Sequence, residues 1–78
     1  MYIRVLGSGC SKCTTLAART REALGRLDLD AEVVDEHDLV EIAAAGVMRT
    51  PALEVDGRVL IAGRLPSTDE LTDLLRGS

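Results

Sequence analysis

The fold is decided by a stretch near the N-terminus that reads YIRVLGSGCSKC, residues 2–13. Residues 2–6 are strand-forming side chains, and the glycines that follow predict a loop. A helical period begins at Ser11, so Cys10 and Cys13 fall where the loop becomes a helix. The N-terminus of a helix carries a partial positive charge and unpaired N–H groups, which favour a thiolate over a thiol. The two cysteines are therefore candidates for thiol chemistry.

Helical and strand patterns alternate along the rest of the chain. The helical spacing from Ser11 continues to about Leu27, and residues 31–35 predict a second strand. A strand, a helix and a strand in this order predict a βαβ unit with a right-handed crossover.

The second half predicts a helix, a hairpin and a final helix. The first of these covers residues 39–45 and is stopped by Gly46, a residue type common just after a helix. Two strand-like runs flank Asp56-Gly57, which suits a type I′ turn because both central residues need a positive φ. The predicted order is β-α-β-α-β-β-α. The first and last helices are expected on one face of the sheet and the middle helix on another side.

Both later helices begin with a predicted capping box. Asp38 precedes the middle helix with Glu41 three residues later, and Ser67 precedes the last helix with Glu70 at the same spacing. In a capping box each side chain accepts a hydrogen bond from the backbone of the other residue.

Composition and charge exclude several function classes. The 78 residues carry nine Lys and Arg against thirteen Asp and Glu, a net charge of −4, so no basic face for a nucleic acid is expected. No apolar run is long enough to span a membrane, and the N-terminus lacks the pattern of a signal peptide. We therefore expect a single domain over residues 1–78, monomeric and cytoplasmic, with no nucleic-acid or membrane partner. In that reducing compartment a CxxC pair is typical of redox chemistry or metal binding.

The order of elements, with CxxC at the first loop–helix junction and Thr50-Pro51 before the third strand, resembles the thioredoxin-like superfamily. Within it, the chain is most similar to the small, glutaredoxin-sized proteins described as redox-active disulfide proteins. The resemblance covers nearly the whole chain. It implies an α/β, thioredoxin-like fold with a four-stranded mixed sheet and three helices, and the activity of a thiol-disulfide oxidoreductase.

The resemblance also implies a role for each motif residue. Cys10 would be the attacking thiolate and Cys13 would resolve the mixed disulfide, so a redox-active Cys10–Cys13 disulfide would stand in place of a cofactor. Thr50-Pro51 would have a cis peptide bond, and Thr50 would offer backbone groups to an extended substrate. Lys12 would add a positive charge beside the thiols and belong to the substrate-binding set. The expected partners are a disulfide-containing protein substrate and a reductase that the sequence does not identify.

Three departures from the family pattern bear on specificity. Ser11-Lys12 stands between the cysteines, where thioredoxins commonly have Gly-Pro and glutaredoxins Pro-Tyr. Gly9 replaces the aromatic residue that usually precedes the thioredoxin motif. Gly63 is followed by Arg64, in place of the second glycine and the aspartate with which glutaredoxins grip glutathione. A protein disulfide is therefore the expected substrate class.

Two alternatives use the same cysteines. Small heavy-metal-associated domains also place CxxC after a first strand, and two thiolates suit linear Cu(I), as in a copper chaperone-like domain. Those domains run β-α-β-β-α-β, whereas this chain closes on a helix. Zinc would need further ligands that the chain hardly supplies, so we expect no metal. The other alternative is a non-catalytic module whose CxxC senses the redox state.

The other candidate residues are interpreted as solvated. His37, the only histidine, lies at a strand-to-helix junction with no cysteine near it in sequence, which favours a loop role over that of a base. Three arginines of the first helix are interpreted as its solvated face: Arg19, Arg21 and Arg26.

Overall fold

The elements of the chain follow the predicted β-α-β-α-β-β-α order. The computed structural model describes residues 1–7 and 11–77. Its elements are β1 (Tyr2–Leu6), α1 (Ser11–Leu27), β2 (Glu32–Glu36), α2 (Leu39–Ala44), β3 (Ala52–Val55), β4 (Arg58–Ala62) and α3 (Thr68–Arg76). None of the helices in this described part of the chain is both long and apolar enough to cross a membrane.

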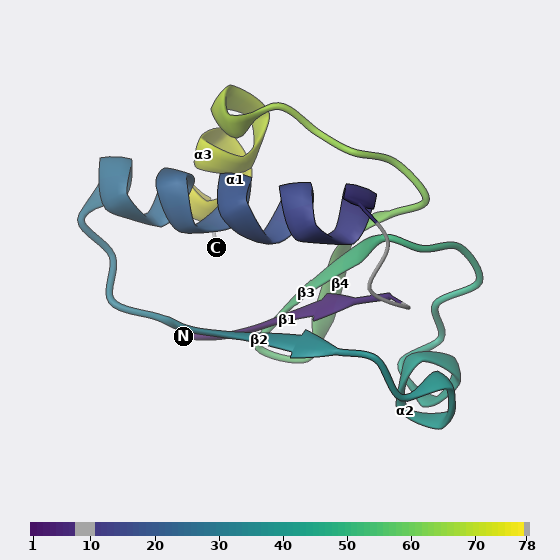
Figure 1. Ribbon diagram of the computed structural model, residues 1–78. Coiled ribbons are helices and arrows are strands. Elements are labelled where there is room, and N and C mark those ends of the chain that lie inside the picture. The colour runs from purple at the N-terminus through teal and green to yellow at the C-terminus, as the bar shows by residue number, and fades with distance from the viewer. Residues whose placement is uncertain (8–10, 78) are drawn as a thin grey trace.

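The four strands form one mixed sheet in the order β2-β1-β3-β4 (Figure 1). β1 pairs with β2 in parallel and with β3 antiparallel, and β3 and β4 form a hairpin. The hairpin turns at Asp56-Gly57, where φ is 49° at the first residue and 86° at the second. Two positive φ angles in succession are the mark of the predicted type I′ turn.

Helices cover the two faces of the sheet unequally (Figure 1). α1 and α3 lie together over one face, and α2 lies on the other side, as expected. The buried apolar residues on the α1–α3 side are Ile3, Val5, Leu16, Ala17, Ala23, Leu24, Leu53, Val55, Ile61, Leu71 and Leu75. Those on the α2 side are Leu6, Ile42, Val47 and Ala52. The division follows from the alternation of side chains along each strand.

The α2 side of the sheet also carries an ion-pair cluster around Arg4. Arg4 donates to the Glu54 carboxylate through Nε at 2.6 Å and through Nη2 at 2.9 Å. The carboxylates of Glu36 and Glu41 lie 3.8 Å and 3.6 Å from Arg4 Nη1. The hydrogen bond to Glu54 is the main cause that raises the pKa of Arg4 above its ordinary value. Glu54 is only 6% exposed, and Arg4 neutralises the charge of its buried carboxylate.

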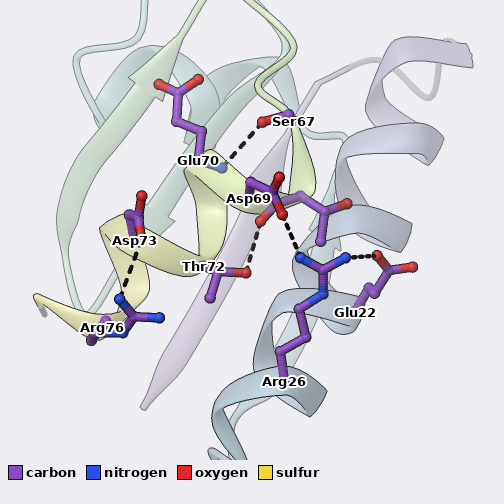
Figure 2. Close-up of polar contacts among 9 residues, drawn as sticks. Glu22, Arg26, Ser67, Asp69, Glu70, Thr72, Asp73 and Arg76 are labelled. Carbon is purple, nitrogen blue, oxygen red and sulfur yellow. Dashed lines mark hydrogen bonds and ion pairs between the residues drawn. The ribbon is translucent and has the colours of Figure 1, made fainter.

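Arg26 joins α1 to α3 (Figure 2). Its Nη1 donates to Asp69 of α3 at 2.6 Å, and its Nη2 donates to Glu22, one turn earlier on α1, at 3.2 Å. Arg19 also reaches across and donates to the Pro66 carbonyl at 2.9 Å. Arg26 is exposed, as expected of a solvated side chain, whereas Arg19 is partly buried, which was not expected. The packing of α3 on α1 brings acceptors to both arginines.

Asp38 and Ser67 cap α2 and α3, but each predicted capping box is only half present. Ser67 Oγ accepts from the backbone N–H of Glu70 at 3.1 Å (Figure 2), and Asp38 Oδ1 accepts from a backbone N–H of the first turn of α2 at 2.9 Å. The carboxylates of both glutamates contact arginines in place of the backbone N–H of the capping residue. The Glu70 carboxylate binds Arg64, and Glu41 faces the Arg4 cluster. The return bonds were predicted wrongly because arginines outside these helices compete for the two carboxylates.

Candidate active site

Cys13 lies where α1 begins, at the carboxyl end of β1. It is the third residue of α1 and only 4% exposed. Leu16 and Ala17, three and four residues later, are buried as well, so Cys13 belongs to the inward face of the helix. Cys10, the expected nucleophile, lies outside the described residues.

Gly7 provides the backbone against which the Cys13 sulfur packs. A Cβ added to Gly7 would lie 2.2 Å from Cys13 Sγ and 3.7 Å from Thr50 Cβ. The Gly7 N–H donates to the Glu36 carbonyl at 3.0 Å, which continues the pairing of β1 with β2 beyond the last residue of β1. A glycine is therefore needed here because the sulfur approaches the backbone so closely.

Thr50-Pro51 lies beside the same glycine. The peptide bond between Thr50 and Pro51 is cis, the isomer that the resemblance implied. Pro51 is buried and Thr50 is exposed, and the Pro51 carbonyl accepts a hydrogen bond from the Gly63 N–H at 2.9 Å. Because Gly7 approaches both Thr50 and Cys13, the fold brings this dipeptide to the start of α1.

Exposed side chains flank these elements. Lys12 is exposed in the first turn of α1, and Met48, in the segment that leads to Thr50, is 94% exposed. The stem of Arg49 packs over Gly63, since a Cβ added there would lie 2.9 Å from Arg49 Cβ. The side chains next to Cys13 and Thr50 in sequence therefore include two cations and one apolar group.

A cleft of about 300 Å³ lies beside Cys13. The described residues that line it are Val5, Cys13, Thr14, Ala17, Arg21, Asp35 and His37. Val5 and Asp35 are register partners in the parallel pair of β1 and β2, so Asp35 points to the α1 side of the sheet. The cleft thus lies between α1 and β2, the strand at the edge of the sheet.

His37 is held in this cleft by the backbone of Gly7. His37 Nδ1 lies 2.9 Å from the Gly7 carbonyl oxygen. Because a carbonyl can only accept, Nδ1 carries the hydrogen and donates it. In the neutral ring the lone pair is then on Nε2. His37 is an exposed loop residue, as expected, but the sequence did not predict the hydrogen bond that holds its ring.

Gly7, Asp35 and His37 are the site residues that sequence reasoning missed. His37 lies 24 positions after Cys13 in the sequence, and the parallel pairing of β1 with β2 brings them to one cleft. The available signal was that Gly7 directly follows the first predicted strand, residues 2–6, and that His37 lies two residues after the second, residues 31–35. Parallel strands bring such residues to the same edge of a sheet.

A metal site is the alternative use of the two cysteines. Among residues 1–7 and 11–77, no three His, Cys, Asp or Glu side chains are grouped in a way that could hold a metal ion. The two-thiolate Cu(I) alternative depends on Cys10, which lies outside those residues. The chain also closes on the helix α3, whereas the heavy-metal-associated domains close on a strand.

Comparisons with known proteins agree with this geometry. The family described as "Thioredoxin domain" matches residues 1–76. The chain belongs to this family. It is 37% identical over 75 residues to a thioredoxin from Methanothermobacter thermautotrophicus, covering 96% of this chain and 97% of that protein. It is 35% identical over 76 residues to a thioredoxin from Methanocaldococcus jannaschii, covering 97% of this chain and 87% of that protein.

The family and the structure together confirm the thioredoxin-like fold predicted from the sequence. The sheet is four-stranded and mixed, with three helices in the predicted order. The relatives support a thioredoxin-like redox function, which places the chain broadly among oxidoreductases.

Proposed function

We propose that this member of the thioredoxin family exchanges protein disulfides through the dithiol of Cys10 and Cys13. The observation that carries the proposal is the position of Cys13. Its sulfur is buried at the start of α1 against Gly7, and Thr50 lies against the same glycine. Cys10 lies three residues before this sulfur in the sequence, a spacing that allows a disulfide across the first turn of a helix.

The reaction has two exchange steps. The Cys10 thiolate attacks one sulfur of the substrate disulfide, and the other substrate sulfur leaves as a thiolate that takes up a proton. Cys13 then loses its proton and attacks the Cys10 sulfur of the mixed disulfide. The Cys10–Cys13 bond forms, the Cys10–substrate bond breaks, and the second substrate sulfur leaves with the electron pair. Two electrons have passed to the substrate, and a separate thiol reductase would return the protein to its dithiol form.

Thr50 is the proposed docking point for an extended substrate segment. It is exposed, and it precedes β3, which begins at Ala52, so its backbone lies outside the strand pairing of the sheet. Extended peptides gain affinity from backbone hydrogen bonds of this kind. Lys12, exposed in the first turn of α1, would favour an acidic neighbour of the substrate disulfide and a thiolate at Cys10.

Two cysteine variants test the proposal. Cys10→Ser is expected to abolish the reduction of insulin disulfides by dithiothreitol above the uncatalysed rate. Cys13→Ser is expected to accumulate a mixed disulfide with the substrate, visible by non-reducing electrophoresis and reversed by excess reductant. A melting curve for each variant controls for folding, because Cys13 is buried.

The opposite pattern would overturn the proposal. Undiminished activity of Cys10→Ser would remove Cys10 from the reaction. A wild-type protein that exchanges no disulfide but binds one equivalent of Cu(I) would favour the copper-binding alternative.

A further inference from the structure

We propose that His37 is the proton acceptor for the Cys13 thiol in the second exchange step, acting through the solvent of the cleft that both residues line. This role rests on the proposed function, because it concerns the thiol that resolves the mixed disulfide. It assigns chemistry to a residue that follows β2, a part of the fold separate from both the cysteine motif and Thr50-Pro51.

Cys13 needs help to lose its proton. Only the thiolate attacks a disulfide, and burial opposes the formation of a thiolate. Cys13 is 4% exposed and packs against the Gly7 backbone, so bulk water has little access to its sulfur. Cys13 lines the cleft together with the polar residues Arg21, Asp35 and His37, and the cleft volume of about 300 Å³ is ample for water molecules.

His37 is fixed in the form that suits a proton acceptor. Its Nδ1–H donates to the Gly7 carbonyl at 2.9 Å, so Nε2 keeps the lone pair of the neutral ring. Gly7 is also the residue against which Cys13 Sγ packs. A single residue at the end of β1 is therefore in contact with both the imidazole and the sulfur, and both side chains line the same cleft.

Charged groups surround His37 on three elements. Arg21 of α1 and Asp35 of β2 line the same cleft and carry opposite charges. Glu36 faces the Arg4 cluster on the other side of the sheet, and it accepts from the Asp38 N–H at 3.2 Å. The Asp38 side chain is engaged at the start of α2. Arg21 and Asp35 are thus the charged side chains that share the cleft with His37 in the described structure.

Every proton and electron pair in the step has a donor and an acceptor. The Cys13 thiol gives its proton to His37 Nε2 through cleft water as its sulfur attacks the Cys10 sulfur. The Cys10–Cys13 bond forms, the substrate sulfur leaves with the electron pair, and it is protonated by solvent or by the imidazolium. His37 is neutral again after the proton leaves for bulk water. No oxidant other than the mixed disulfide is consumed.

The two exchange steps can be separated with the chromogenic disulfide dithiobis(nitrobenzoate). The reduced protein is mixed with an equimolar amount of the reagent in a stopped-flow spectrometer. The first release of thionitrobenzoate reports attack by Cys10, and the second reports resolution by Cys13. The variant Cys13→Ser calibrates the amplitude of the first phase, because without the resolving thiol it can release only one equivalent of thionitrobenzoate per protein.

The key variant is His37→Asn. The asparagine amide can still donate to the Gly7 carbonyl, but it cannot accept a proton near neutral pH. We expect an unchanged first phase and a second phase that is about a hundredfold slower, the lower end of the range for general-base catalysis. The melting temperature of His37→Asn controls for folding.

Each other outcome contradicts the role. A second phase with the wild-type rate in His37→Asn would show that only the hydrogen bond to Gly7 matters. An equal slowing of both phases would make His37 a structural residue. Release of fewer than two equivalents by the wild type would contradict dithiol exchange itself, which is a failure of the proposed function and is seen without any His37 variant.

Discussion

The side of the sheet under α1 and α3 buries eleven of the described apolar residues, whereas the α2 side buries four and adds the Arg4–Glu54 pair. α2 itself has six residues, too few to be stable without tertiary contacts. Cys13 lies on α1, and the cleft that it shares with His37 lies on the same side. The comparison indicates that the proposed chemistry lies on the side with the larger apolar core, while the α2 side combines a small apolar cluster with a partly buried ion pair.

Truncations on the two sides should therefore differ in cost. Leu53 (0% exposed) belongs to the α1–α3 core, and Ile42 (5% exposed) belongs to the α2 cluster. We expect Leu53→Ala to lower the free energy of unfolding by about 3–5 kcal/mol and Ile42→Ala by about 2 kcal/mol, within the range for large-to-small core changes. Urea denaturation measures both. Equal losses would show that the two sides contribute alike.

The Arg4–Glu54 pair tests the polar contribution of the α2 side. Glu54→Ala leaves Arg4 half-buried with only the two more distant carboxylates, so we expect a loss of about 2–3 kcal/mol. The double variant Arg4→Met with Glu54→Leu removes both charges and should lie within about 1 kcal/mol of the wild type. A double variant as unstable as Glu54→Ala would mean that the ion pair itself supplies the stability of this side.

Two glycine substitutions compare the site with the rest of α1. Gly7→Ala would place a Cβ 2.2 Å from Cys13 Sγ and should cost about 1–3 kcal/mol. Gly25→Ala, in the helix with nothing within 4 Å of the added Cβ, should instead stabilise the protein by about 0.5–1 kcal/mol. Thermal melting distinguishes the two signs. A neutral Gly7→Ala would contradict the close packing of the sulfur on this backbone.

The exposed Arg64–Glu70 pair should have the smallest effect. The hydrogen bond from Arg64 lowers the pKa of Glu70 in the folded state, so the folded state holds its proton less tightly than the unfolded chain does. The contribution of the pair is therefore present above the ordinary glutamate pKa and is lost as the pH falls through the lowered folded value. Glu70→Gln should melt slightly below the wild type at neutral pH, and the difference should vanish in acid. A difference that persists in acid would have another cause.

The sequence predicted the elements well because their signals are local. The helical period from Ser11 and the turn chemistry of Asp56-Gly57 each act over a few residues. The helix α1 continues to Leu27, as predicted, and ends where Asp28 adopts a φ of 53°.

The contacts between elements could not be predicted in the same way. The Arg4–Glu54 pair depends on the antiparallel register of β1 with β3, and the placement of His37 depends on the parallel pairing of β1 with β2. Neither register is encoded by a local pattern. The family resemblance supplied Cys13 and Thr50-Pro51, but it carried no information about the cleft beside them.

The central claim is that Cys10 and Cys13 form one reversible dithiol–disulfide couple. Its most direct test is equilibration of the protein in dithiothreitol or glutathione redox buffers, with the protein thiols counted after acid quenching and alkylation. The account predicts a single two-electron transition from two thiols to none, with a midpoint between about −270 and −120 mV and no covalent dimer. Two thiols that stay reduced at every potential, or that are lost only by linking two chains, would contradict it.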